Sequence, residues 1–317
     1  MRIIFFGTPD YVIPVLDKLH RYHEPQRERY EIVAVVTQSP KPVGREKKLT
    51  YSAVDSWAFK KNIPRNFDYN DLPDADMGVC ASFGMIIPQA VLDKFKHGIL
   101  NIHPSLLPQF RGSSPIQATL ISGINPTGVT IIRMIDKLDA GPILTQFKEE
   151  VLPDDTNESL RARLFEKSAD VLLEMIPAYI DGKIKYKHQD EEKASFTTMI
   201  KKEDAFIPLE FIKNAMNLNF VMELNSNNKT WEVGFIKNYN LTPSAEVINR
   251  IIKAMSFWPV AWTNIEISNN KVKITKRLKI ISSHINPESG YLELDEVQLE
   301  GKKPTSWKQF KGAYGIN

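Results

Sequence analysis

The chain has 317 residues, of which 42% are hydrophobic and 25% charged, and a net charge of +3, which indicates an ordinary globular protein with one large core or two domains. No apolar run approaches the ~18 residues that a membrane-spanning helix needs, and "RIIFFG" follows Met1 without a targeting segment before it. The single cysteine, Cys80, excludes an internal disulfide and a cysteine-based zinc site. We expect a bacterial cytoplasmic protein with no membrane partner, in which Cys80 is a small core residue.

The first half of the chain alternates strand-like and helix-like segments. Helices are expected after Thr8, as N-cap, and Pro9, near Pro88 and after Pro115. The strands are continuous apolar runs, which suit a parallel sheet covered on both faces: "RIIFFG", "EIVAVVT", "DMGVCAS", "GILNIH" and "GVTIIRM". The pattern predicts an α/β fold with an open, doubly wound, Rossmann-like and mostly parallel sheet, whose ligands sit beyond the carboxyl ends of the strands.

The second half changes pattern. A long helix is expected where Asp155 and Glu158 have capping-box spacing. The polar stretch 186–204 then reads as a linker between a catalytic domain, 1–185, and a C-terminal domain, 205–317. That last domain holds short strand-like runs with turn residues between them, which predict a small OB-like β-barrel.

Charge is distributed unevenly along the chain. Residues 1–200 carry 25 Lys and Arg against 26 Asp and Glu, whereas residues 201–317 carry 16 against 12. The basic excess gathers in "KVKITKRLK" and "GKKPTSWKQFKG". A solvated face and a surface for a polyanion both fit this pattern.

Asn101 and His103 end one of the expected strands, in "LNIHPSLLPQFRGSSPIQ". Positions two apart in a strand project to the same side, and Pro104 cannot extend the ladder, so the pair stands at the carboxyl end. An amide and an imidazole in a cleft can hydrogen-bond a developing oxyanion, and the imidazole can pass a proton. A packed histidine beside a turn-forming asparagine fits these two residues equally well.

Asp139 follows the strand "GVTIIRM", in the turn "LDAGP". A turn aspartate usually makes a local hydrogen bond to the backbone. This turn also lies beyond a strand of the same sheet, so Asp139 can meet His103. A carboxylate beside an imidazole orients the ring and favours its protonated form.

The long stretch 100–117 together with "LDAGPI" resembles the signature of the folate-dependent formyltransferases. Three further stretches resemble the branch that formylates methionyl-initiator tRNA: "IIFFGTPDYVIPVLDKL", "TQSPKPVGREKKL" and "VQLEGKKPTSWKQFKGAY". The resemblance covers nearly the whole chain. It implies transfer of a formyl group from 10-formyltetrahydrofolate to the α-amino group of methionyl-initiator tRNA, by an enzyme that we expect to be a monomer. It also implies that Asn101 and His103 stabilise the oxyanion, and that Asp139 holds His103 and helps relay the proton.

The same resemblance implies the binding residues. Apolar walls should sandwich the pterin ring while backbone groups read its polar edge. The folate-binding residues expected are Phe83, Gly84, Met85, Ile87, Ser105, Leu106, Leu107, Pro108, Leu138 and Gly141. The tRNA-binding residues expected are Lys41, Arg45, Lys47, Lys48, Arg111, Lys271, Lys273, Lys276, Arg277, Lys302 and Lys303.

Neither a metal nor a nicotinamide cofactor is expected. His20 and His23, the only close histidine pair, have no obvious third ligand. The first strand is followed by "GTPD" rather than by Gly-x-Gly-x-x-Gly.

Two other functions compete with formylation of tRNA. The first is a formyltransferase for a small amine, such as glycinamide ribonucleotide or an amino-sugar nucleotide. It is disfavoured because such an enzyme does not need the basic loop and the basic C-terminal domain. The second is a nucleic-acid-binding protein with a degenerate α/β half. It is disfavoured because such a protein does not need Asn101, His103 and Asp139 together. The purpose of the irregular stretch 217–239 is not indicated by the sequence.

Overall fold

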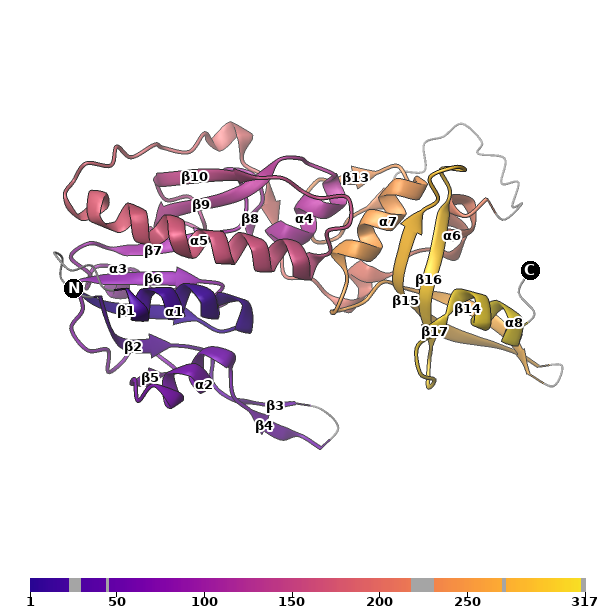
Figure 1. Cartoon of the computed structure of the whole chain (residues 1–317), viewed down its shortest axis with the longest axis horizontal. Coiled ribbons are helices and arrows are strands. Elements are labelled where there is room, and N and C mark those ends of the chain that lie inside the picture. Colours follow the sequence, from indigo (N-terminus) through magenta and orange to yellow (C-terminus); the bar gives the residue numbers. More distant parts are fainter. Residues whose placement is uncertain (23–29, 44–45, 218–230, 270–271, 315–317) are drawn as a thin grey trace. The chain divides into compact units, whose positions relative to one another are not determined.

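A computed structural model of the chain describes residues 1–22, 30–43, 46–217, 231–269 and 272–314. The chain divides into two units, drawn in Figure 1. The first unit consists of Met1–Pro115, Pro126–Glu150 and Arg161–Phe196, and the second of Ile116–Asn125, Val151–Leu160 and Thr197–Asn317. The chain therefore passes into the second unit inside the expected linker 186–204. The functional division into 1–185 and 205–317 stays a prediction.

The first unit is built on a seven-stranded sheet with the order β10-β9-β7-β6-β1-β2-β5. Neighbouring strands from β5 to β7 run parallel, whereas β9 is antiparallel to both β7 and β10. These strands are β1 (Arg2–Gly7), β2 (Glu31–Val36), β5 (Arg65–Asn66), β6 (Met77–Ala81), β7 (Ile99–His103), β9 (Thr127–Arg133) and β10 (Ile143–Glu149). The expectation of a mostly parallel α/β sheet is confirmed.

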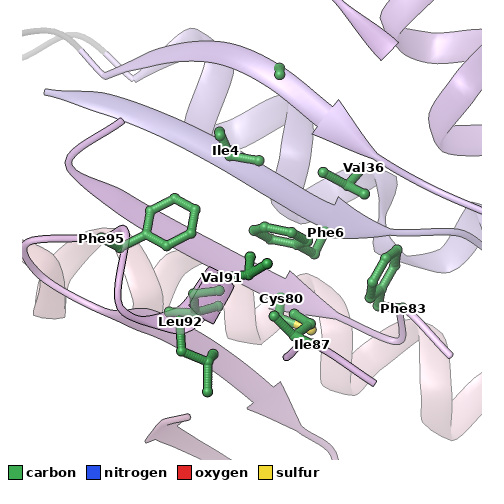
Figure 2. Packing of buried hydrophobic residues seen from close by; sticks show 11 residues of the cluster. Ile4, Phe6, Val36, Cys80, Phe83, Ile87, Val91, Leu92 and Phe95 are labelled. Atoms are coloured by element: carbon green, nitrogen blue, oxygen red, sulfur yellow. The ribbon is translucent and has the colours of Figure 1, made fainter. Parts of the chain in front are cut away.

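Helices cover the sheet, which explains its unbroken apolar strands. Alternate residues of β1, β2 and β6 pack on one face against the short helix α3 (Gln89–Leu92), and Figure 2 shows Ile4, Phe6, Val36 and Cys80 together with Val91 and Leu92. The intervening residues of β1, Ile3 and Phe5, are also fully buried. Each such side chain contributes ~1.5–3 kcal/mol by leaving water.

The remaining elements of the first unit surround this sheet. The Lys18–Asp170 ion pair, 2.6 Å, joins helix α1 to helix α5. The elements are the 3-10 turns η1 (Asp10–Val12) and η2 (Glu191–Lys193), the helices α1 (Ile13–Arg21), α2 (Ala53–Lys60), α3 (Gln89–Leu92) and α5 (Asn157–Ile180, whose first turn belongs to the second unit), the hairpin β3 (Lys41–Val43) and β4 (Lys48–Thr50), and the short strands β8 (Arg111–Gly112) and β11 (Phe196–Thr197).

Two expected helix starts were wrong by a few residues. Thr8 does not cap α1; its hydroxyl instead donates to the carbonyl of Phe83 at 3.0 Å and ties β1 to the loop after β6. At α5 the reciprocal bonds join Thr156 to Ser159, at 3.0 and 3.3 Å, rather than Asp155 to Glu158. A hydroxyl pair one position later satisfies the same amide groups that a capping box would satisfy.

The second unit contains a four-stranded antiparallel sheet with the order β14-β15-β16-β17. Helix α7 packs on it, and the buried hydroxyl of Ser283 donates to Asn249 at 2.8 Å between β15 and α7. Its elements are α4 (Pro115–Ser122), η3 (Lys202–Ala205), α6 (Leu209–Ala215), β12 (Trp231–Glu232), β13 (Asn240–Leu241), α7 (Ala245–Ala254), β14 (Trp262–Asn269), β15 (Val272–Ile285), β16 (Leu292–Leu299), β17 (Thr305–Ser306) and α8 (Trp307–Tyr314). A C-terminal β module, expected as a small OB-like barrel, is confirmed as an antiparallel sheet, whose described strands have the open order β14-β15-β16-β17.

None of the helices within the described ranges combines the length and the apolar character that crossing a membrane requires. The irregular stretch 217–239 lies mostly outside the described residues.

Candidate active site

Strand β7 brings Asn101 and His103 to the carboxyl edge of the sheet. Asn101 stands level with Cys80 of β6 and with Ile132 of β9, so β7 is flanked on both sides. The two residues are only 8% and 4% exposed. The amide and the imidazole are thus buried at the carboxyl end of a strand that has a neighbour on each side.

The loop after β7 is held by hydrogen bonds to β9. The hydroxyl of Thr130 donates to the carbonyl of Ser105 at 2.7 Å and accepts from the amide of Leu107 at 3.0 Å. The side chain of Ser105 donates to the carbonyl of Gln109 at 2.6 Å. These bonds give the stretch "SLLPQF" one conformation directly beyond His103.

Asp139 joins the other two residues, as the sequence predicts. Its carboxylate accepts from the side-chain amide of Asn101 at 3.3 Å and lies 3.6 Å from Nδ1 of His103. It also accepts from the backbone amide of Gly112 at 2.8 Å. Asp139 has a positive φ of 47°, a conformation that aspartate tolerates better than most residues. Amide, imidazole and carboxylate therefore meet at one point.

The imidazole of His103 is fixed at both nitrogens. Nδ1 faces Asp139, and Nε2 lies 3.0 Å from the carbonyl of Phe110. The proton positions depend on the tautomer, but both neighbours are oxygen acceptors. The ring can thus hold a proton on either side in an orientation that the backbone fixes.

Arg111 is buried, although it was expected on a tRNA-binding surface. Its side chain is 0% exposed, and its guanidinium donates to Gln189 and to Glu191 at 2.8–3.1 Å. A guanidinium with no exposed surface has no access to a phosphate, so the assignment of Arg111 to tRNA binding is wrong. Its partners lie 78 and 80 residues away in the expected linker, and no periodicity or motif in the sequence marks them.

The expected folate-binding residues fall into a buried and an exposed group. Phe83, Ile87, Ser105 and Leu107 are at most 5% exposed, whereas Met85 and Leu138 are 37% and 63% exposed. Gly84 has a positive φ of 76°. The remaining members are Leu106, Pro108 and the buried Gly141. Those up to Pro108 follow β6 or β7 at the carboxyl edge of the parallel strands, whereas Leu138 and Gly141 lie in the turn after the antiparallel β9, the turn that also carries Asp139.

The expected tRNA-binding residues lie in both units. Lys41, Lys47 and Lys48 are exposed on the β3–β4 hairpin of the first unit. In the second unit the guanidinium of Arg277 stacks 4.1 Å from the ring centre of Trp262. The other described members there are Lys273, Lys276, Lys302 and Lys303. Arg45 and Lys271 lie outside the described residues.

Cys80 is buried in β6, and burial, with a smaller contribution from the charge of Asp139, raises the pKa of its thiol to about 12. Because the thiolate is the reactive form, the native protein should not react with a thiol reagent at pH 8. One thiol per chain should react after unfolding in guanidinium. The variant Ser56→Cys, exposed on α2, provides an accessible control. Rapid labelling of the native parent would contradict the burial of Cys80.

The groups that converge at the sheet edge can donate to an oxygen and carry a proton. Across the part of the chain that the structure describes, no three His, Cys, Asp or Glu side chains are grouped to hold a metal ion.

Comparisons with known proteins agree with this geometry. Residues 1–176 match the family model described as formyl transferase. The methionyl-tRNA formyltransferase of Bacillus cereus is 32% identical, covering 98% of this chain and 95% of that protein, and that of Bacillus thuringiensis subsp. konkukian is 31% identical with the same coverage.

Solved structures share the fold. A methionyl-tRNA formyltransferase from Clostridium thermocellum has a TM-score of 0.54 at 16% identity, covering 94% of this chain and 98% of that one. An N-formyltransferase from Helicobacter canadensis, solved with folinic acid and dTDP-3-aminofucose, has a TM-score of 0.59 at 18% identity, covering 96% and 98%. Because the identities are this low, these two structures show only that the fold is shared. The family model and the full-length relatives show that the chain belongs to the formyltransferase family and, within it, to the methionyl-tRNA formyltransferases.

Proposed function

We propose that this enzyme moves the formyl group of 10-formyltetrahydrofolate to the α-amino group of methionyl-initiator tRNA, and that Asn101, His103 and Asp139 carry out the transfer. The observation that carries the proposal is the contact of the Asp139 carboxylate with both other side chains, at 3.3 and 3.6 Å. The fully covered relatives named for this reaction support the choice of acceptor.

Asn101 acts on the formyl oxygen, and His103 can donate to it only when Nε2 exchanges its contact with the Phe110 carbonyl for the formyl oxygen. Attack by the amine forms a carbon–nitrogen bond and places negative charge on that oxygen, and breakage of the bond to N10 of the folate then releases the product. The amide of Asn101 has two N–H groups, of which Asp139 binds one, so the second is held in a fixed direction. A donor fixed in this way is typically worth ~3 kcal/mol of barrier. Preorganised donors matter here because an amide-type carbonyl is a poor electrophile.

Asp139 and His103 handle the proton. The attacking amine loses a proton, and N10 of the folate gains one as the bond to the formyl carbon breaks. The carboxylate, fixed by Gly112, keeps Nδ1 of His103 within reach, so the pair can accept the first proton and supply the second. No net acid or base is consumed.

The folate is proposed to bind at the carboxyl edge of the sheet. Two solved N-formyltransferases with this fold were determined with 5-N-formyltetrahydrofolate or with folinic acid. Here the loops after β6 and β7 carry the buried apolar side chains Phe83, Ile87 and Leu107, and these loops are where we place the flat pterin ring. The carbonyl of Phe83 is fixed by donors from Thr8 and Gln38, at 3.0 and 3.3 Å, so the backbone at this edge is held for recognition of polar groups.

The β3–β4 hairpin is proposed to contact the tRNA. Replacing Lys47 and Lys48 together by glutamine should raise KM for the tRNA several-fold and leave KM for the folate unchanged. The log–log dependence of tRNA affinity on salt should become less steep by roughly 1.4 to 1.8, since each of the two lost phosphate contacts contributes about 0.7 to 0.9. A matched control, Lys94→Gln with Lys96→Gln, removes two exposed lysines that precede β7, at the opposite edge of the sheet. An unchanged salt dependence in the hairpin variant would contradict this contact.

The acceptor is tested by a direct assay. The enzyme should formylate methionyl-initiator tRNA with 10-formyltetrahydrofolate, and free small amines at comparable concentration should remain unmodified. Glycinamide ribonucleotide and an amino-sugar nucleotide are the informative alternatives, because other formyltransferases use such acceptors. Transfer to a small amine but not to the tRNA would overturn the proposal.

A further inference from the structure

The segment from Lys187 to Glu191 is part of the active-site architecture rather than a free linker. Lys187 and Ile143 exchange two backbone hydrogen bonds, at 2.8 and 3.0 Å, at the start of β10. Two residues later, the side-chain amide of Gln189 donates to the carbonyls of Asp139 and Gly141, at 2.7 and 2.8 Å. This segment thus lies along the turn that carries Asp139 and bonds to its backbone on both sides of Ala140.

Arg111 fixes the orientation of the Gln189 amide. Nε and one terminal nitrogen of Arg111 donate to Oε1 of Gln189 at 3.1 and 2.9 Å. The oxygen of the amide therefore faces two donors, and its nitrogen faces two carbonyls. A flipped amide would place its N–H groups against the donors of Arg111 and its oxygen against the two carbonyls. Because Arg111 is fully buried, water cannot take the place of Gln189 as its hydrogen-bond partner.

Glu191 in turn holds Arg111. Its carboxylate accepts two bonds from the guanidinium, at 2.8 and 3.1 Å, and one from Lys137 at 2.9 Å. The hydrogen bonds from Arg111 and then from Lys137 lower the pKa of Glu191 to about 2. The carboxylate therefore stays charged over the whole range in which an enzyme assay is run.

The chain of contacts closes on Asp139. Gly112, the neighbour of Arg111, donates its backbone amide to the Asp139 carboxylate at 2.8 Å, while Gln189 binds the Asp139 carbonyl. The backbone of Asp139 is thus held by the segment of Gln189, and its side chain by Gly112. Arg111 links these two segments. We propose that Gln189 is a positioning residue, which sets the Asp139 carboxylate against His103 and Asn101 and is itself oriented by Arg111. This inference rests on the proposed role of Asp139 in formyl transfer.

Gln189→Glu is the sharpest test, because it keeps the size of the side chain and an oxygen for Arg111. It replaces the two N–H donors by an oxygen that faces the carbonyls of Asp139 and Gly141, so the turn should shift. His188→Glu is the matched control, since it adds the same charge at the exposed neighbouring position. Gln189→Met, with similar length and no donors, is measured in the same way if the glutamate variant does not fold.

The expected result is a fall in kcat of at least tenfold for Gln189→Glu, with KM for folate and for tRNA within twofold of the parent. His188→Glu should keep kcat within twofold. A folded Gln189 variant whose kcat falls less than fivefold, or whose loss appears in KM alone, would overturn the positioning role.

A second readout needs no acceptor and separates this inference from the proposed reaction. The chain has six histidines, so the ring nitrogens of His103 can be followed by NMR in protein labelled with 15N-histidine and assigned with a His103→Gln variant. The His103 signals should move in Gln189→Glu and stay in place in His188→Glu. Unchanged His103 signals in Gln189→Glu would overturn the inference even if the parent formylates tRNA. Shifted signals would support it even if the acceptor proved to be another amine.

Discussion

Asp139→Ala should lower kcat by roughly a hundredfold to ten-thousandfold, the range that a lost acid–base or oxyanion-stabilising group produces. The carboxylate accepts from Asn101 and from Gly112 and faces His103, so its removal frees the amide and the imidazole together. KM for the tRNA should stay within about twofold, because Asp139 is almost buried and does not belong to the basic surface. Steady-state kinetics with each substrate varied in turn measures both effects.

The control is Asp136→Ala, which removes an exposed carboxylate three residues earlier in the same turn and should leave kcat near the parent value. His103→Ala should match the loss of Asp139→Ala, and the double variant should fall little further, since residues that act as one unit are strongly non-additive. Fully additive losses would show that the two side chains work independently, contrary to the shared-contact geometry.

Gly141→Ala should destabilise the protein by ~3 kcal/mol, at the upper end of what overpacking costs. A Cβ at this position would lie 1.9 Å from the backbone carbonyl oxygen of Arg133, and that oxygen cannot rotate away as a side chain can. The turn that carries Asp139 must then move, so turnover should fall as well. Thermal unfolding should show a Tm roughly 6–12 °C below that of the parent, since 1 kcal/mol corresponds to about 2–4 °C in a domain of 150–250 residues.

Gly312→Ala is the matched glycine control. Gly312 lies in helix α8, and an added Cβ meets nothing within 4 Å. Alanine favours a helix over glycine by about 0.5–1 kcal/mol, so this variant should keep or slightly raise the Tm. A Gly141→Ala protein with the Tm and kcat of the parent would show that the turn can relax without cost.

Local pattern was enough to predict the sheet and to place Asn101 and His103 side by side. A strand period of two places Asn101 and His103 on one side. Asp139 could be expected near them only because its turn follows a strand of the same sheet. Strand β9 runs antiparallel to β7, with Arg133 opposite Leu100, so this turn begins beside the start of β7 and returns to Asn101 and His103 at Asp139. The first statement depends only on neighbours along the strand, whereas the path of the turn that carries Asp139 is not given by the strand pattern.

Long-range polar contacts could not be predicted in the same way. Arg111 follows Gln109 and Phe110 in a loop, yet its guanidinium is bound by Gln189 and Glu191, which lie in a stretch whose polar composition predicts a linker. A buried cation requires partners, but the sequence does not say which of the many carboxylates and amides supplies them. The Thr8 cap failed for a related reason: the hydroxyl found a distant carbonyl in Phe83 rather than the start of its own helix.

The central claim is that Asn101, His103 and Asp139 surround the formyl group during transfer. The most direct measurement is a crystal structure of this enzyme with an unreactive 10-formyl folate analogue, in which carbon replaces N10. We predict that the formyl oxygen lies about 3 Å from the side-chain nitrogen of Asn101 or from the ring of His103, with Asp139 still against the ring. A bound analogue whose formyl group lies beyond hydrogen-bond reach of both side chains would contradict the account.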